Sequence, residues 1–378
     1  MKLPVLIALC LSALAAAAPA LAVAPVPNPP AVQAKGYVLM DFATGQALAG
    51  SNADQRLEPA SLTKLMTTYV VFDALRSGRL KMDEQILISE HAWRAEGSRT
   101  FVQVGTRVPV DTLIKGMIVQ SGNDATIALA ERVGGTEPAF VEMMNGYAKR
   151  LGMSSSHFED STGLPSPQHY TTPTDLATLS RAIIRDFPEY YGLYSLKEFT
   201  YNNIRQENRN GLLERDPSVD GMKTGHTDAA GYCLISSAKR QNMRLVSVVM
   251  GSPSVKARED ASETLLNYGF TNFETVSLKK AGETVLKPRI YKGSMEYVAV
   301  GPNSEVQLTV PRGESGMVVT QASVRRPLLA PLDTHTAIGE LQVSVGDKLV
   351  TKLPLFALTP VPQGSLWTRM VDTISLWF

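Results

Sequence analysis

Cysteine is nearly absent from this chain of 378 residues, since Cys10 and Cys233 are the only two. So few thiols exclude a disulfide-rich scaffold and any zinc site built from cysteine alone. An excess of charge of one sign is also lacking, because 37 Lys and Arg residues balance 36 Asp and Glu residues. A nucleic-acid-binding protein needs a clustered basic excess, so we expect no nucleic-acid partner.

Motifs for metals and nucleotides are missing as well. The five histidines are scattered along the chain, with no His-Glu-x-x-His motif and no acidic cluster at ligand spacing. Neither a P-loop nor a dinucleotide-binding glycine fingerprint occurs. We therefore expect no metal and no cofactor. Hydrophobic residues make up 44% of the chain and charged residues 19%, which is typical of a folded globular protein.

The first 22 residues have the pattern of a secretory signal peptide. Lys2 precedes an apolar run over 5–18, and a small-x-small cleavage site ends at Ala22. The run is shorter than a membrane span, and Pro19 interrupts it. We predict that residues 1–22 are removed on export. The mature chain then keeps only Cys233, which its apolar neighbours mark as a small buried hydrophobe rather than a nucleophile.

The length favours two domains, because single cores stop growing at roughly 250–300 residues. Within 23–275, helical patterns occupy the middle and strand patterns occupy both ends, which indicates an α+β domain whose antiparallel sheet is built from both ends of the sequence. The helical patterns cover residues 60–77, 110–119, 124–133, 138–151, 254–267 and a stretch starting at 172. Short alternating runs separated by Gly, Pro and Asp predict a small all-β domain over 276–362.

The last segment, 363–378, has the pattern of an amphipathic helix. Its apolar residues share one helical face; they are Trp367, Met370, Val371, Ile374, Trp377 and Phe378. The segment is too short to span a bilayer, and two Trp residues and a Phe on one face suit a helix lying in a membrane interface. The alternative is a terminal helix docked on the protein's own core. We predict the membrane anchor.

One short motif carries nucleophile chemistry: Ser-Leu-Thr-Lys from Ser61 to Lys64. On a helix, positions i and i+3 share a face, so the hydroxyl and the amine can be neighbours. A lysine with a lowered pKa can activate a serine as its base. Two more Ser-x-x-Lys matches begin at Ser236 and Ser277 but open no helix, so the motif alone is weak.

Two further motifs make the pattern specific. Ser121-Gly122-Asn123 lies between two helical patterns, and Lys-Thr-Gly at 223–225 begins a strand pattern. Ser-x-x-Lys, Ser-x-Asn and Lys-Thr-Gly in this order are the signature of penicillin-recognising serine acyl transferases.

With these motifs, the chain resembles the low-molecular-mass penicillin-binding proteins of the D-alanyl-D-alanine carboxypeptidase type. The resemblance covers nearly the whole chain and includes the segments 206–213 and 219–227. It implies a transpeptidase/β-lactamase-like domain, then a small β domain and a C-terminal amphipathic helix. It also implies a hydrolase of cell-wall metabolism that removes the terminal D-Ala from peptidoglycan stem pentapeptides and is acylated by β-lactams. The expected location is the periplasm, with a peripheral anchor on the outer face of the cytoplasmic membrane.

Chemistry and the resemblance together imply the catalytic roles. Ser61 would attack the carbonyl of the penultimate D-Ala, and Lys64 would take its proton. Ser121 would relay that proton to the leaving amine, and the charge of Lys223 would favour a neutral Lys64. Asn123 would hold the amide oxygen of the substrate.

Four more residues are expected to bind the substrate. The backbone N–H groups of Ser61 and His226 match in position the family's oxyanion hole. Thr224 and Arg258 would receive the free terminal carboxylate, although Arg258 could instead be a solvated charge on a helix. Gly225 would let the substrate backbone approach the strand closely.

Three other functions share some of these features. A class A β-lactamase is disfavoured because the stretch 157–170 lacks a Glu-x-x-Leu-Asn motif, although it holds Glu159 and Asp160. A peptidoglycan endopeptidase of the same fold stays the alternative, together with a non-catalytic muropeptide-binding morphology protein. A mere binder would not need both Ser61 and Lys64. We therefore predict the carboxypeptidase.

Overall fold

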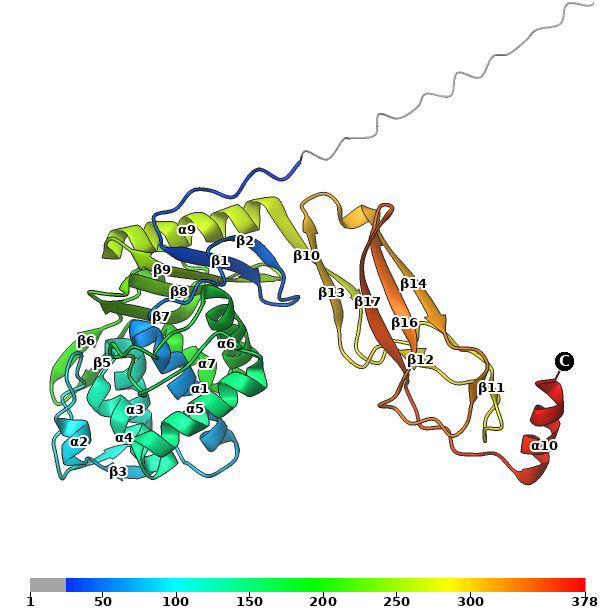
Figure 1. Ribbon diagram of the computed structural model, residues 1–378, viewed down its shortest axis with the longest axis horizontal. Helices are drawn as coiled ribbons and strands as arrows, with labels where there is room; N and C mark the ends of the chain where they lie inside the picture. The colour runs from blue at the N-terminus through cyan, green and yellow to red at the C-terminus, as the bar shows by residue number, and fades with distance from the viewer. Residues whose placement is uncertain (1–24, 378) are drawn as a thin grey trace, which may run out of the picture.

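The computed structural model describes residues 25–377, so the predicted signal peptide lies outside the described residues. Two bodies follow each other along the chain, a mixed α and β body and an elongated β body (Figure 1). A short helix, α10 (Leu366–Ser375), lies at the far end of the second body.

The first body is built on a five-stranded antiparallel sheet in the order β2-β1-β9-β8-β7. Its strands are β1 (Gly36–Asp41), β2 (Ala47–Ser51), β7 (Val219–Thr227), β8 (Gly231–Arg240) and β9 (Met243–Ser252). The strand β1 pairs with β9, which follows it by some two hundred residues. The prediction of a sheet assembled from both ends of the sequence is therefore confirmed.

Both faces of this sheet are buried. Side chains of a strand alternate between the two faces, and β1 shows the consequence. Val38 and Met40 join the core on the helical side, while Tyr37 and Leu39 join the core beneath α9 (Val255–Asn272). In Figure 1, α9 covers one face, and α1 and the helices that pack around it lie on the other.

The helical side contains α1 and the helices that pack around it. Its longer members are α1 (Lys64–Arg76), α3 (Val110–Lys115), α4 (Asn123–Gly134), α5 (Glu137–Leu151) and α6 (Pro173–Asp186). Its short turns are η1 (Ala60–Thr63), α2 (Glu90–Trp93), η2 (Gly116–Gln120), α7 (Pro188–Tyr191) and η3 (Gly192–Ser195). Two small hairpins complete it, β3 (Gln85–Leu87) with β4 (Arg107–Pro109) and β5 (Glu198–Tyr201) with β6 (Ile204–Glu207). The single turn α8 (Leu212–Arg215) lies on the other side of the sheet, where Leu212 and Leu213 join the core beneath α9.

The start of α6 shows how sequence signals set a helix end. The Thr172 hydroxyl accepts a hydrogen bond from the backbone N–H of Asp175, and Pro173 occupies the first turn, where no N–H donor is needed. The predicted helix start at 172 is confirmed. The predicted helix over 60–77 is divided in the structure, because Ala60–Thr63 form a 3₁₀ turn before α1 begins at Lys64.

The second body begins with β10 (Phe273–Lys279), which follows α9 directly and pairs with β13 (Val306–Pro311). A four-stranded sheet comes next in the order β12-β17-β16-β14. Its strands are β12 (Val300–Gly301), β14 (Val318–Val324), β16 (Ala337–Val345) and β17 (Lys348–Ala357). The short strands β11 (Ile290–Tyr291) and β15 (Leu328–Leu329) pair in parallel, and η4 (Ser315–Met317) is a single turn. The prediction of a β domain after the catalytic region is confirmed.

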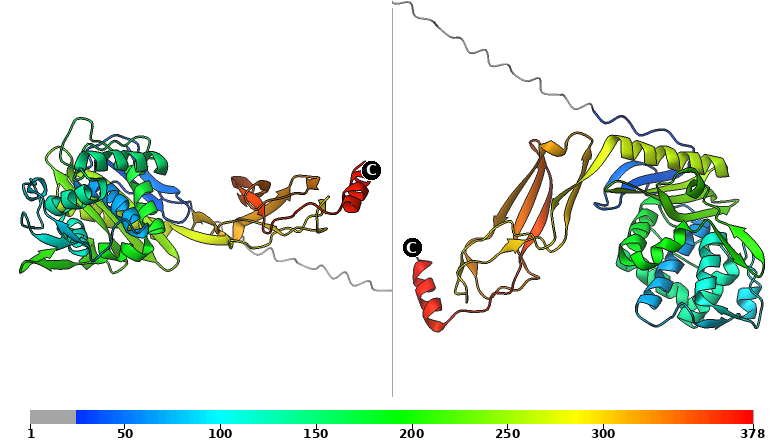
Figure 2. Two further views of the ribbon diagram at one scale, coloured as in Figure 1. Left: turned by 90° about the horizontal axis from the view of Figure 1, so that it is seen from below. Right: turned by 180° about the vertical axis from the view of Figure 1, so that it is seen from behind.

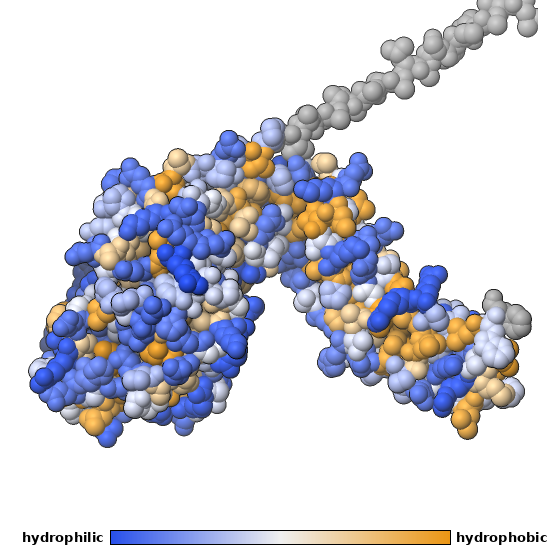
Figure 3. All heavy atoms as spheres, in the orientation of Figure 1, coloured by the Kyte–Doolittle hydropathy of each residue, from blue (hydrophilic) through white to orange (hydrophobic). Residues whose placement is uncertain are grey.

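The helix α10 has its apolar face in solvent. Trp367 is 70% exposed and Trp377 82% exposed. By contrast, Asp372 is buried against the β body, where it accepts a hydrogen bond from the backbone N–H of Lys292. Figure 2 shows α10 at the end of the molecule away from the first body, and Figure 3 shows apolar side chains in that region. The alternative of an apolar face docked on the protein's own core is therefore wrong. Within residues 25–377, no helix is long and apolar enough to cross a membrane.

Candidate active site

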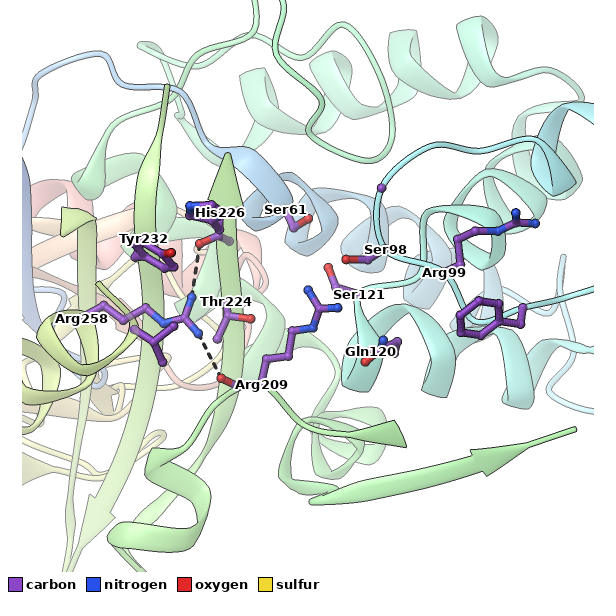
Figure 4. Close-up of a pocket in the computed structure, with 14 residues that line it drawn as sticks. Ser61, Ser98, Arg99, Gln120, Ser121, Arg209, Thr224, His226, Tyr232 and Arg258 are labelled. Atoms are coloured by element: carbon purple, nitrogen blue, oxygen red, sulfur yellow. Dashed lines mark hydrogen bonds between the residues drawn. The ribbon is translucent and has the colours of Figure 1, made fainter. Parts of the chain in front are cut away.

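A cleft of about 770 Å³ opens where η1, β7 and the start of α9 meet the loops before α3 and α4. Its lining includes Ser61, Ser98, Arg99, Gln120, Ser121, Arg209, Thr224, Gly225, His226, Tyr232 and Arg258. Figure 4 shows the hydroxyl groups of Ser61, Ser98 and Ser121 gathered at its centre, with the guanidinium group of Arg209 beside them. All three sequence motifs thus contribute to one site.

Ser61 and Lys64 are neighbours across one helical turn, as their spacing predicts. The Lys64 amine donates a hydrogen bond to Ser61 Oγ at 3.0 Å. Lys64 is fully buried, and its Nζ also donates to Asn123 Oδ1 and to the carbonyl of Thr162, both at 2.7 Å. The amine therefore has three acceptors around it, and one of them is the candidate nucleophile.

The electrostatics around Lys64 favour a neutral amine near physiological pH. Burial lowers the pKa of Lys64 to about 7, because the charged form loses its hydration. The Asp160 carboxylate raises this pKa, the Arg209 guanidinium lowers it, and Asp124 raises it slightly. An amine with a pKa near 7 can accept a proton from a serine hydroxyl under physiological conditions.

The second motif contributes Ser121 to the lining of the cleft and Asn123 to the contacts of the Lys64 amine. Ser121 directly follows η2 in the left-handed region, with a φ of 66°, and its buried Oγ has no hydrogen-bond partner among the described residues. Asn123 is the first residue of α4; its Oδ1 faces Lys64 and its Nδ2 donates to the carbonyl of Glu96 at 2.6 Å. The structure therefore brings Asn123 to Lys64, and its contact with a substrate amide stays a prediction.

The third motif lies on β7, at the edge of the sheet. Lys223 is buried, and its pKa falls well below the usual value because of burial and because Lys64, Arg209 and Arg258 are close. Thr224 and His226 line the cleft, and the His226 ring stacks on Tyr232 with centroids 4.0 Å apart. The other Ser-x-x-Lys matches lie on β8 and β10, so they are chance matches, as their lack of a helix start indicated.

Arg258 lies beneath the cleft and is only 4% exposed. Its guanidinium donates to the carbonyls of Gly225 and Cys233 at 3.4 Å and to that of Arg209 at 3.1 Å. Within residues 25–377, its buried Nε has no hydrogen-bond partner. The alternative interpretation of Arg258 as a solvated helix charge is therefore wrong.

Sequence reasoning missed several lining residues, and Arg209 is the most important of them. No side chain that lines the cleft is acidic, whereas Arg99, Arg209 and Arg258 are basic. The cleft therefore suits a substrate that carries carboxylates. Arg209 lies within the run 206–213 that carried the family resemblance, which was the one available signal.

Two other kinds of reactive group are a possible metal cluster and the thiol of Cys233. Among the described residues, no three His, Cys, Asp or Glu side chains cluster as a metal site. Cys233 is buried as expected, and burial raises the pKa of its thiol to about 11. Such a thiol is a poor nucleophile.

A serine hydroxyl beside a buried, pKa-lowered lysine, on this α+β fold, defines a serine-type acyl-transferring enzyme. Residues 23–254 match the family described as D-alanyl-D-alanine carboxypeptidase, and residues 273–363 match the C-terminal domain of penicillin-binding protein 5. The chain belongs to the D-alanyl-D-alanine carboxypeptidase family and is a serine-type enzyme of that activity.

The similarity to known relatives extends along nearly the whole chain. The D-alanyl-D-alanine carboxypeptidase DacD of Salmonella typhimurium is 42% identical over 93% of this chain and 92% of its own. DacA of Escherichia coli is 39% identical over 93% of this chain and 90% of its own. Among solved structures, penicillin-binding protein 5 from Haemophilus influenzae superposes with a TM-score of 0.85, at 42% identity, over 89% of this chain and all of that one. The endopeptidase and the non-catalytic binder are not favoured by these comparisons.

Proposed function

We propose that the carboxypeptidase reaction proceeds through an acyl-enzyme on Ser61. The single observation that carries this proposal is the 3.0 Å hydrogen bond between Lys64 Nζ and Ser61 Oγ. Neutral Lys64 takes the Ser61 proton while Oγ attacks the carbonyl carbon of the penultimate D-Ala. The C–N bond to the terminal D-Ala then breaks, and water later hydrolyses the ester and restores Ser61.

The leaving amine needs a proton, and Ser121 can deliver it. Its buried hydroxyl lines the cleft and has no partner among the described residues, so it is free to pass on the proton that Lys64 accepted. A positive charge on Lys64 lowers the pKa of the buried Lys223, so the two amines disfavour being charged at the same time. Asn123 holds the Lys64 amine and, as the sequence predicts, also contacts the substrate amide.

Substrate binding relies on the edge strand β7. The backbone N–H groups of Ser61 and His226 would stabilise the oxyanion, a device worth roughly 3–4 kcal/mol per donor. Thr224 and Arg258 would receive the terminal carboxylate; the unpartnered Nε of Arg258 supports this role. Peptidoglycan stem peptides ending in D-Ala-D-Ala are the proposed substrates, and β-lactams the proposed acylating inhibitors.

The molecular arrangement supports a protein held at a membrane surface. We assign residues 23–275 to the catalytic domain, 276–362 to the β domain and 363–378 to an anchor in the outer face of the cytoplasmic membrane. The exposed apolar face of α10 supports the anchor, since its burial in a lipid interface would remove apolar surface from water. The β domain would then hold the cleft away from the bilayer, and the signal peptide would direct the chain to the periplasm.

Intact-protein mass spectrometry with benzylpenicillin tests the acyl-enzyme, with release of D-Ala from a D-Ala-D-Ala peptide followed in parallel. We expect a stable adduct on Ser61 and none in Ser61→Ala. Ser277→Ala is the matched control, because Ser277 opens a chance Ser-x-x-Lys match on β10. An adduct on another residue, or full D-Ala release by Ser61→Ala, would refute the assignment.

A further inference from the structure

The segment between α5 and α6 passes behind Lys64 and is hydrogen-bonded to α1. The carbonyl of Thr162 accepts from Lys64 Nζ at 2.7 Å, and the carbonyl of Ser161 accepts from Thr67 Oγ1 at 2.6 Å. One of the three acceptors around the catalytic amine therefore belongs to a backbone turn outside all three motifs.

Asp160 holds this turn in shape. Its Oδ1 accepts from the backbone N–H groups of Thr162 and Gly163, each at 2.6 Å, and from Thr162 Oγ1 at 2.9 Å. Gly163 has a φ of 93°, and a Cβ at this position would lie 1.8 Å from the carbonyl oxygen of Ala60. The turn thus packs closely against Ala60, the residue before the nucleophile. The direction of the Thr162 carbonyl depends on the hydrogen bonds that Asp160 accepts.

His169 connects the same carboxylate to the nucleophile turn. Its ring is buried, with Nδ1 3.4 Å from Asp160 Oδ2 and Nε2 2.9 Å from Thr63 Oγ1. The ring also packs edge-on against Phe158. Thr63 precedes Lys64 in the chain, and the Thr162 carbonyl accepts from Lys64 Nζ. The contacts from Thr63 through His169 and Asp160 to Thr162 therefore form a closed loop that includes Lys64.

We propose that Asp160 and His169 are positioning residues of the carboxypeptidase reaction: they hold the Thr162 carbonyl against the Lys64 amine, and the Asp160 carboxylate stabilises the protonated form of that amine. Neither side chain lines the cleft, so neither touches the substrate. The inference rests on the proposed role of Lys64 as the base.

The surrounding charges set the sign of the expected effect. Burial raises the pKa of Asp160, but His169 and the backbone N–H groups of Gly163 and Thr162 lower it to about 2, so the carboxylate is ionised wherever the enzyme works. Asp160 opposes the lowering of the Lys64 pKa by burial. The other charged groups that act on Lys64 are Asp124 on α4 and Arg209, and the titratable amine of Lys223 on β7 also lies close to it. Asp160 itself shares a surface pocket with His91, Glu137, Glu142, His157 and Glu159.

The decisive variant is Asp160→Asn, which keeps an Oδ1 acceptor for the turn and removes only the charge. The acid limb of kcat/KM should move to lower pH, by up to about 1 unit, because the neutral form of Lys64 is then easier to reach. Glu142→Gln is the matched control, because Glu142 is an exposed charge of the same surface pocket. An unmoved limb in Asp160→Asn together with an unmoved titration of Lys64, or an equal shift of the limb in Glu142→Gln, would overturn the proposal.

Two further measurements separate this inference from its premise. A titration of Lys64 by NMR in protein labelled with [6-¹³C]lysine follows the amine directly. A lowered Lys64 titration with an unmoved acid limb would keep the electrostatic effect of Asp160 and refute Lys64 as the base. Rescue by conservative variants tests whether the two side chains hold the 160–163 turn in shape. At pH values above the acid limb, Asp160→Ala and His169→Ala should lose about tenfold or more in kcat/KM. Asp160→Asn and His169→Gln should recover most of that loss. Equal losses in the alanine and conservative variants would refute the positioning role.

Discussion

Gly225 of the edge strand β7 lies against the backbone of Ser61. A Cβ at position 225 would lie 3.2 Å from the Ser61 nitrogen and 3.2 Å from the carbonyl oxygen of Pro59. The absence of a side chain therefore lets η1, the turn that carries Ser61, approach β7 closely. The sequence predicted close approach of a substrate at Gly225, and the structure shows close approach of the enzyme's own backbone.

This contact predicts the effect of Gly225→Ala. The added methyl group should push η1 and β7 apart by a few tenths of an ångström and lower kcat/KM by about tenfold, since small displacements of a nucleophile are costly. Gly192→Ala is the control, because a Cβ there meets nothing within 4 Å. Steady-state kinetics and thermal melting of both variants would check it. Equal kcat/KM in the two variants would contradict the packing argument.

The pKa of Lys64 predicts the pH dependence of acylation. Burial lowers this pKa to about 7, and the base must be neutral to act. Activity is therefore present above pH about 7 and lost below it, by about tenfold per pH unit. Lys64→Arg keeps a permanent charge and should lose about 10²–10⁴ in acylation rate at every pH. Stopped-flow acylation by a chromogenic β-lactam measures both; a flat profile through neutral pH would exclude Lys64 as the base.

The buried guanidinium of Arg258 predicts a substrate preference. If it receives the terminal carboxylate, Arg258→Gln should reduce kcat/KM for a D-Ala-D-Ala peptide by about 10- to 100-fold, the range expected for a charged hydrogen bond. The same variant should change kcat/KM for the C-terminal amide of that peptide much less. Lys256→Gln removes an exposed charge from the same helix and should have little effect. Equal losses on both peptides would assign Arg258 to holding β7 and β8 instead.

The exposed face of α10 predicts membrane association. Deletion of residues 365–378 should release the protein from anionic liposomes in a flotation assay, and Trp367→Ser should weaken binding, because each removes apolar surface from the interface. Hydrolysis of a small soluble peptide should not change, since α10 lies at the end of the molecule away from the cleft. Thr373→Ser is the matched control, because it changes the polar face of α10 and leaves the apolar face intact. Continued flotation of the truncated protein would place the anchor elsewhere.

Much of the fold could be predicted because its signals are local. The cap at Thr172, the strand pattern at β1 and the apolar stripe of α10 each lie within a few residues, and each is present in the structure. The division at η1 was missed, because the 3₁₀ turn arises where Ala60 contacts Gly163 of a distant segment. Periodicity within one helix contains no information about that contact.

The residues of the candidate site also fall into those that local sequence signals predict and those that they do not. The three motifs named Ser61, Lys64, Ser121 and the Lys223 strand, because chemistry demands those residue types in a short window. Arg209 was missed, since a lone arginine has no local pattern that points to a cleft. For the turn at Asp160, the sequence indicated only that the Glu-x-x-Leu-Asn motif of a class A β-lactamase is absent. Its contact with Lys64 could not be predicted, because that contact joins segments roughly a hundred residues apart.

The sequence by itself determined which groups are available: a serine and a lysine one helical turn apart, two more motifs in order, and a terminal amphipathic helix. Tertiary structure alone decided which Ser-x-x-Lys match faces a cleft, which arginine is buried beneath it, and that Lys64 is removed from water with three acceptors around its amine. The physical reason is that desolvation and hydrogen bonding depend on what surrounds a group in space. A lysine has its ordinary pKa in an extended chain and a pKa near 7 only when distant segments close around it.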